Sequence, residues 1–219
     1  MSNAISYSRM STHKKCGLKY RYAYIDKIKI DRGEPGPALV RGNMMHDSIE
    51  NHIGKDEPLH EELVFWAQWL NSLKSAYTCL PESTWGITKD WEPCEFDSED
   101  AFLRGIWDLK VLPVDDTLEI FEWKTGKVYD EHKDQRYLYA FAGLLHHPEV
   151  KNVRVTTVYL DQKKQEADMW STENLMSMKG HYKAKVMLMG MDQTWIPNPN
   201  WTCRWCDFRK SNRGLCSFG

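Results

Sequence analysis

Long hydrophobic runs are missing from this chain of 219 residues. No stretch of about 18 consecutive apolar residues occurs, so the sequence predicts no transmembrane helix. It also contains no internal repeat and no low-complexity tract, which argues against solenoids, propellers and flexible linkers. The net charge is only -2 at pH 7, and the chain therefore lacks the overall basic excess that attracts nucleic acids. Any specific chemistry must be read from local motifs.

The apolar content, in contrast, is sufficient for a packed core, since 42% of the residues are hydrophobic and ten are tryptophan. The residue patterns predict an α/β protein in which a central mixed sheet is flanked by helices. We expect one domain over residues 1–219, with a helical N-terminal part at 1–57, a sheet and helix at 85–170 and a cysteine-rich tail at 197–219. The expected helices are 8–26, 38–52, 61–77, one that contains Gln135, and 172–189, and the expected strands are 87–96, 102–112, 118–124, 153–160 and 167–170.

Two acids and one lysine are predicted to share one face of a β-hairpin. Successive side chains of a strand alternate between faces, so Glu122 and Lys124 project to the same side. The turn-forming segment Pro113–Thr117 precedes this strand, and a hairpin that is symmetric about Asp115 places Asp108 directly opposite Glu122. Opposed carboxylates repel each other unless a proton or a cation lies between them. A hard divalent cation fits there, and Lys124 beside it could orient or deprotonate an attacking water.

The pattern of an acid, a turn and Glu-x-Lys resembles the active site of the PD-(D/E)XK nuclease superfamily. The run Glu122-Trp123-Lys124-Thr125-Gly126-Lys127 is similar to the catalytic strand of its RecB-type exonuclease branch. This resemblance implies a restriction-endonuclease-like core. It also implies that Asp108, Glu122 and the backbone carbonyl of Trp123 bind Mg²⁺ or Mn²⁺, and that Lys124 activates water. From the residues alone, Glu-x-Lys also suits an ordinary solvated strand face.

Two further elements match this family in its order. His46 stands in Gly42-Asn43-Met44-Met45-His46, which resembles the G-x-x-x-H element and implies a histidine at the same metal site. Gln135 and Tyr139 resemble the Q-x-x-x-Y element, which implies contact with the DNA backbone or orientation of the catalytic groups. Their spacing of four places both on one face of a helix. The alternatives are a structural histidine and a half-buried tyrosine beside a surface glutamine.

Three of the six cysteines lie near the C-terminus, at Cys203, Cys206 and Cys216. Cys-x-x-Cys spacing lets two thiolates bind one metal or cluster from a tight turn, and Cys216 could supply a third ligand. Cys16 is the natural fourth. Zinc bound by four thiolates, disulfides and inert thiols are the alternatives. Disulfides are disfavoured because the chain shows no apolar signal segment, which indicates a reducing cytosol.

One cysteine before the catalytic motifs and three after them resemble the iron-sulfur branch of these nucleases, to which CRISPR-associated adaptation exonucleases and the AddB nuclease domain belong. The resemblance implies a 4Fe-4S cluster that is held by Cys16, Cys203, Cys206 and Cys216 and joins the N- and C-terminal segments. Nine residues separate Cys206 and Cys216, more than is usual in that branch, so Zn²⁺ stays open as the alternative.

Together these features predict a metal-dependent deoxyribonuclease, an exonuclease that acts on DNA ends or single strands in a bacterial cytosol or a phage-infected cell. The compact chain resembles stand-alone phage or CRISPR-adaptation nucleases. A second copy of the chain and proteins of recombination or CRISPR systems are candidate partners, and a membrane is not. Two other functions stay open, a non-catalytic DNA-binding or assembly module with the same fold and a zinc-stabilised protein-interaction domain.

Overall fold

The computed structural model describes residues 4–30, 33–209 and 215–218. The chain divides into two compact units. The first comprises residues 36–179 with Ala4, and the second combines the described residues of 5–35 and 180–219. The parts expected at 1–57 and 197–219 therefore include positions outside the described residues, at 1–3, 31–32, 210–214 and 219. Within the described ranges, every helix is too short or too polar to span a membrane.

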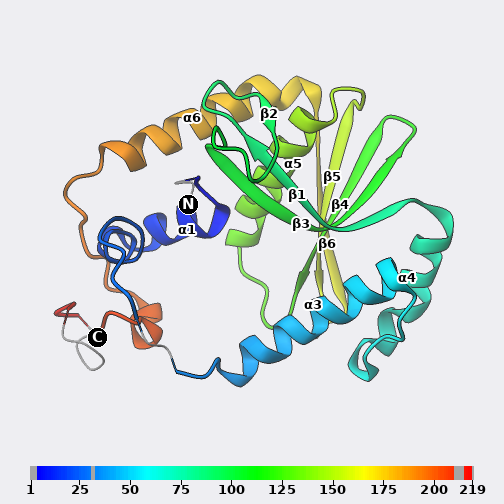
Figure 1. Ribbon diagram of the computed structural model, residues 1–219, viewed down its shortest axis with the longest axis horizontal. Coiled ribbons are helices and arrows are strands. Elements are labelled where there is room, and N and C mark those ends of the chain that lie inside the picture. The colour runs from blue at the N-terminus through cyan, green and yellow to red at the C-terminus, as the bar shows by residue number, and fades with distance from the viewer. Residues whose placement is uncertain (1–3, 31–32, 210–214, 219) are drawn as a thin grey trace. The chain divides into compact units, whose positions relative to one another are not determined.

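A six-stranded mixed sheet forms the centre of the first unit (Figure 1). The strand order is β2-β1-β3-β4-β5-β6, with β4 and β5 parallel and every other neighbouring pair antiparallel. This arrangement confirms the expected α/β fold class with a mixed sheet flanked by helices. The strands are β1 (Cys79–Ile87), β2 (Pro93–Cys94), β3 (Leu103–Val114), β4 (Thr117–Lys124), β5 (Asn152–Tyr159) and β6 (Lys164–Ser171).

Helices cover both faces of this sheet. On one face lie α3 (Pro37–Lys55) and α4 (Val64–Ala76), whose apolar side chains share one core cluster with β3, β4 and β5. A short 3-10 helix, η2 (Glu61–Leu63), precedes α4. Helix α5 (Glu131–His146) connects the parallel strands β4 and β5 and packs on the other face. Gly143 permits this close packing, because a Cβ there would lie 3.0 Å from Val153 Cγ1.

Strand β4 alternates between these two layers, as the sequence predicts. Phe121 and Trp123 belong to the core cluster with α3 and α4. Glu122, between them, hydrogen-bonds to Gln135 of α5. Leu118 and Ile120 precede Glu122 on the same face of β4 and are fully buried near Gly143 of α5, so the acid extends from an otherwise apolar face into the layer opposite the main core.

The expected strand at 87–96 is wrong in its bounds. β1 ends at Ile87, and only the short β2 follows within that range. β1 begins at Cys79 and contains Pro81, which cannot donate to a strand ladder. Pro81 is nevertheless accommodated, since β2 pairs only with Gly86 and Ile87 and leaves one side of β1 unpaired at Pro81.

The second unit is made from both ends of the chain. It contains the short helices α1 (Tyr7–Lys15) and α2 (Gly17–Tyr20), followed by a π-helical turn, η1 (Arg21–Ile25). The single helix expected at 8–26 is therefore interrupted, because Cys16 has extended backbone angles and its Sγ accepts a hydrogen bond from the Lys19 N–H. The division between the units falls within α6 (Leu175–Met191), which begins after the 3-10 helix η3 (Thr172–Asn174), and the 3-10 helix η4 (Trp201–Trp205) follows in the second unit.

Candidate active site

The β3–β4 hairpin carries two acids to the same end of the sheet. Leu109 pairs with Phe121, and the same register continued by one residue places Asp108 opposite Glu122. The backbone N–H of Trp123 donates a hydrogen bond to Asp108 Oδ2 over 2.7 Å. This bond fixes the Asp108 carboxylate beside the end of β4.

Glu122 is a buried carboxylate with an incomplete set of partners. Its side chain lies at the sheet–α5 interface and the residue is only 5% exposed. Oε1 accepts hydrogen bonds from Lys124 Nζ at 2.5 Å and from Gln135 Nε2 at 2.8 Å. Oε2 is buried and has no hydrogen-bond partner among the described residues. A buried carboxylate oxygen without a donor is costly, so the site calls for a proton or a cation.

The charges around Glu122 act on each other. Burial and the charge of Asp108 raise the pKa of Glu122 above its ordinary value, although Lys124 acts in the opposite direction. Burial also lowers the pKa of Lys124, but the adjacent Glu122 outweighs this effect and the pKa of Lys124 is raised. Lys124 is therefore a protonated donor at neutral pH in the metal-free protein.

Helix α5 supports Glu122 from the opposite layer. Gln135 and Tyr139 are both buried, and Gln135 Nε2 also lies 3.0 Å from Tyr139 Oη. Burial raises the pKa of Tyr139 well above its ordinary value, so its hydroxyl stays neutral. Both side chains point to the acid of β4, which suits the orienting role. Contact of Gln135 and Tyr139 with a DNA backbone stays a prediction.

His46 reaches the same place from α3. Its Nε2 lies 3.1 Å from the backbone carbonyl oxygen of Trp123, and because a carbonyl can only accept, Nε2 carries the proton and donates. Nδ1 then lies 3.6 Å from Asp108 Oδ1. In a neutral imidazole both of these atoms present lone pairs. Burial lowers the pKa of His46, but the hydrogen bond and charge of Asp108 more than offset this effect, and the pKa is raised.

Glu82 of β1 also reaches this site, although no sequence motif singles it out. The ligand atoms of His46, Glu82 and Asp108 all lie within 4.8 Å of one another. Burial, and next the charge of Asp108, raise the pKa of Glu82 to about 7. The sequence concealed Glu82 because the strand was expected to begin only at Ile87. The pairing of β1 with β3 could have indicated Glu82, because its register places Glu82 opposite Asp108. That pairing can be predicted only if β1 is known to begin before residue 82.

This donor set fits a hard divalent cation. Mg²⁺ and Mn²⁺ prefer carboxylate oxygens, and Mn²⁺ also accepts an imidazole nitrogen. The unpartnered Oε2 of Glu122, together with the Asp108 carboxylate on the opposing strand, marks a region that is short of positive charge. The residues that could hold the cation are His46, Glu82, Asp108 and Glu122, with the Trp123 carbonyl as a further acceptor that already contacts His46.

Comparison with known families agrees with this geometry. The profile of the PD-(D/E)XK nuclease superfamily matches residues 4–211. The chain belongs to the PD-(D/E)XK nuclease superfamily. Membership supports nuclease activity on DNA and the use of a divalent metal, for which the site has suitable donors.

Two solved structures share the fold of this superfamily member. One is the structure named "Putative exonuclease" from Eubacterium rectale, with 10% sequence identity and a TM-score of 0.55, over 99% of this chain and 90% of that chain. The other is SSO0001, with 14% identity and a TM-score of 0.50, over 95% of this chain and 85% of that chain. A search among curated proteins finds no match. At such identities the similarity establishes the fold alone.

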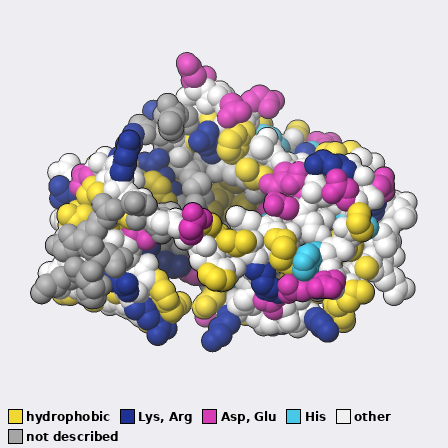
Figure 2. Space-filling model, turned by 60° about the horizontal axis from the view of Figure 1, so that its bottom comes forward, with side chains coloured by type: hydrophobic (Ala, Val, Ile, Leu, Met, Phe, Trp, Pro, Cys, Tyr) yellow, Lys and Arg dark blue, Asp and Glu magenta, His cyan; other side chains and the backbone are white. Residues whose placement is uncertain are grey.

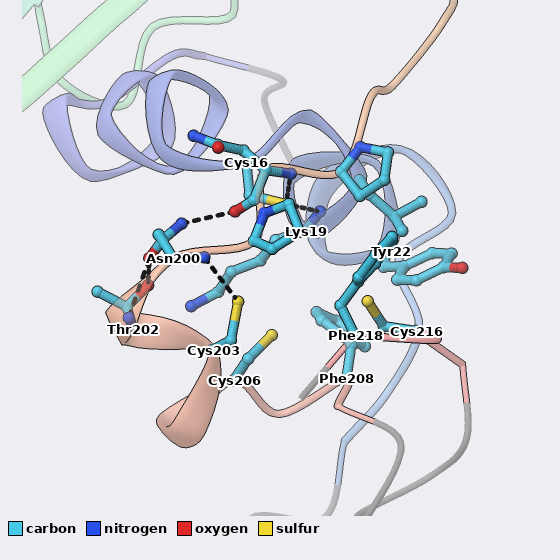
Figure 3. A pocket seen from close by; sticks show the side chains of 14 residues that line it. Cys16, Lys19, Tyr22, Asn200, Thr202, Cys203, Cys206, Phe208, Cys216 and Phe218 are labelled. Carbon is cyan, nitrogen blue, oxygen red and sulfur yellow. Dashed lines mark hydrogen bonds between the residues drawn. The ribbon is translucent and has the colours of Figure 1, made fainter.

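The four cysteines that the sequence groups together line one pocket of the second unit (Figure 3). None of the six cysteines is in a disulfide within the described residues. Cys16 lies between α1 and α2, Cys203 lies in η4, and Cys206 follows η4 directly. Cys216 lies in the described C-terminal residues 215–218. Apolar side chains complete the lining: Leu18, Tyr22, Pro197, Pro199, Phe208 and Phe218.

Backbone N–H groups are directed at two of these sulfurs. The N–H groups of Lys19 and Asn198 each lie 3.5 Å from Cys16 Sγ, and the Asn200 N–H lies 3.3 Å from Cys203 Sγ. The pocket therefore brings together the four predicted cysteine ligands, and metal binding by them stays a prediction.

Proposed function

We propose that this protein is a Mg²⁺- or Mn²⁺-dependent DNA exonuclease that hydrolyses phosphodiester bonds at DNA ends or in single strands. One observation carries the proposal: the buried Glu122 has Lys124 on one oxygen, Asp108 on the opposing strand, and a second oxygen without a partner among the described residues. A carboxylate this deeply buried would have hydrogen-bond partners on both oxygens if its role were only structural. The fold shared with a structure named as an exonuclease supports the choice of exonuclease.

Each residue has a defined task in this proposal. A divalent cation at the site would supply Lewis-acid stabilisation of the charge on the phosphate. Protonated Lys124 orients the attacking water and donates to an oxygen of the phosphate as charge develops there. Gln135 holds the Glu122 carboxylate in place from α5, and the Nε2–H of His46 fixes the imidazole ring against the Trp123 carbonyl.

The distribution of surface charge supports DNA binding through the local site and not through a general basic surface. Acidic and basic side chains are interspersed on the face seen in Figure 2. DNA is therefore expected to bind through a few positioned groups, with a smaller salt dependence than that of a strongly basic protein.

The proposed occupant of the cysteine pocket is a 4Fe-4S cluster. The support for this proposal is that Cys16, Cys203, Cys206 and Cys216 line one pocket, and that Fe–S clusters are held by four Cys thiolates. Four thiolates also suit Zn²⁺, which stays the alternative. Because the ligands must be reduced thiolates, the cytosol is the compartment that we propose.

The test is cleavage of circular and linear DNA, single- and double-stranded, with Mg²⁺ and Mn²⁺ side by side. We expect degradation of linear or single-stranded DNA, and a loss of about 100-fold or more in rate for Lys124→Ala. DNA binding should stay close to wild type. The matched control is Lys164→Ala, which removes an exposed lysine that pairs with Glu166 on the edge strand β6. Metal-dependent turnover that is equal in the Lys124 variant and the control contradicts the proposed role of Lys124.

A further inference from the structure

Glu82 occupies an unusual backbone position in the middle of β1. The residues on either side of it, Pro81 and Ser83, pair with Leu109 and Trp107 of β3. The same register places Glu82 opposite Asp108. The φ angle of Glu82 is 47°, in the left-handed region that residues other than glycine, asparagine and aspartate rarely adopt.

Strain of this kind persists only where surrounding structure imposes it, and it occurs preferentially at ligand sites. The left-handed φ changes the direction of the Glu82 side chain, because in a regular strand side chains simply alternate between the two faces of the sheet. In its actual position the Glu82 carboxylate comes within 4.8 Å of ligand atoms of both His46 and Asp108. The backbone thus brings a carboxylate up to another carboxylate, which is unfavourable without a cation.

The distances are close to those of a coordination shell. With bonds of about 2.1 Å, two ligands on adjacent corners of an octahedron lie about 3 Å apart and two on opposite corners about 4.2 Å apart. Nδ1 of His46 and Oδ1 of Asp108 are already 3.6 Å apart. The Glu82 oxygen lies within 4.8 Å of both, so side-chain movement of at most about 2 Å brings it within range. Independently, the buried Oε2 of Glu122 has no donor among the described residues.

We propose that Glu82 is a direct ligand of the divalent cation, together with His46 and Asp108. This inference rests on the proposed function and adds a residue outside the family motifs of the chain. The cation is then held from α3, β1 and β3, with Glu122 of β4 on the other side of Asp108. An imidazole nitrogen in the set favours Mn²⁺ over Mg²⁺, because nitrogen ligands suit transition metals better.

The experiment measures Mn²⁺ binding to the intact chain after removal of metals, by calorimetry and by electron paramagnetic resonance of free Mn²⁺. Glu82→Gln keeps the size of the side chain and removes its charge. We expect Mn²⁺ affinity to fall by about tenfold or more. The matched control is Glu119→Gln, a strand carboxylate of β4 that pairs with Arg154 over 3.1 Å, and its Mn²⁺ affinity should equal that of wild type.

Thermal unfolding separates a ligand from a merely structural acid. Without metal, Glu82→Gln should melt at the wild-type temperature or above, because it removes one of two repelling carboxylates. With Mn²⁺ the rise in its melting temperature should be smaller than that of wild type. A structural acid would instead lower the melting temperature equally with and without Mn²⁺. Affinity within twofold of wild type, or an equal Mn²⁺-induced rise, overturns the inference.

Failure of this inference is distinguishable from failure of the proposed function. If Glu82→Gln binds Mn²⁺ normally while wild type cleaves DNA and Lys124→Ala does not, the function stands and Glu82 is no ligand. If Mn²⁺ affinity falls in Glu82→Gln while wild type cleaves no DNA under any condition, Glu82 is a ligand of a site that is not a nuclease centre.

Discussion

Replacing Glu122 with glutamine should stabilise the metal-free protein while abolishing cleavage. The environment of this carboxyl favours its neutral form, because burial and Asp108 together outweigh Lys124 and raise its pKa. Glutamine is a neutral isostere, and its carbonyl oxygen can still accept from Lys124 and Gln135. An unpartnered buried atom costs about 1–3 kcal/mol when neutral and more when charged, so replacing the charged carboxylate by a neutral amide lowers this cost without removing it. We therefore expect the free energy of unfolding to rise by about 1–3 kcal/mol, or about 2–12 °C in melting temperature.

The effect has a defined pH dependence. A carboxyl whose folded-state pKa is raised binds its proton more tightly in the folded than in the unfolded state. Its contribution to stability is complete below the unfolded-state pKa and is lost as pH rises towards the folded-state pKa. The difference between Glu122→Gln and wild type should therefore be small at about pH 4 and grow towards neutral pH.

The assay is urea or thermal unfolding in a chelating buffer at several pH values, repeated with Mn²⁺. The control is Glu92→Gln, an exposed acid of the first unit, which should change stability by less than about 0.5 kcal/mol. In Mn²⁺ the order should reverse, because wild type gains binding energy that the variant lacks. A metal-free variant that is less stable than wild type by more than about 1 kcal/mol refutes the reasoning, since Glu122 and Lys124 would then form a net stabilising pair.

Two further predictions concern packing and the cysteine pocket. Gly105→Ala should lower the free energy of unfolding by about 1–3 kcal/mol, because its Cβ would lie 2.4 Å from Trp85 Cζ2. The control, Gly180→Ala in α6, has open space around its Cβ and should leave stability unchanged or raise it. Equal effects of the two substitutions in denaturant unfolding would show that the Trp85 ring moves aside without cost. Cys16→Ser should lose the proposed cluster, measured as iron and acid-labile sulfide after anaerobic purification. An undiminished content of four irons per chain would exclude Cys16 as a ligand.

The shared face of Glu122 and Lys124 was predictable, because side chains in a strand alternate with a period of two. The turn does not set the register at the acids: Val114 pairs with Thr117, and a register shift between Val111 and Val114 places Leu109 opposite Phe121 and hence Asp108 opposite Glu122. Without that shift, which the sequence does not display, Asp108 would lie opposite Trp123. The pattern of Gln135 and Tyr139 likewise follows from helical spacing. The two compact units meet at a boundary inside α6 that no composition change marks, and the single domain expected over 1–219 stays a prediction.

Other features depend on tertiary context that a sequence does not display. Glu82 adopts a left-handed φ of 47° within β1, for which glutamate has no local preference. The break at Cys16 arises because its sulfur accepts the Lys19 N–H and competes with a continuous helix. In both places the departure from local expectation falls on a candidate metal ligand, where strain or irregular backbone is most often found.

The division of the chain into a continuous unit and one made from its two ends has a consequence for biosynthesis. Residues 36–179 are contiguous and can pack while translation continues, but Cys16 must wait about 190 residues for Cys203 to leave the ribosome. At about 5–20 residues per second this delay is roughly 10–40 s. Under the proposal that the cysteine pocket holds a 4Fe-4S cluster, iron and sulfide would be delivered after translation, to a chain whose residues 36–179 are already packed.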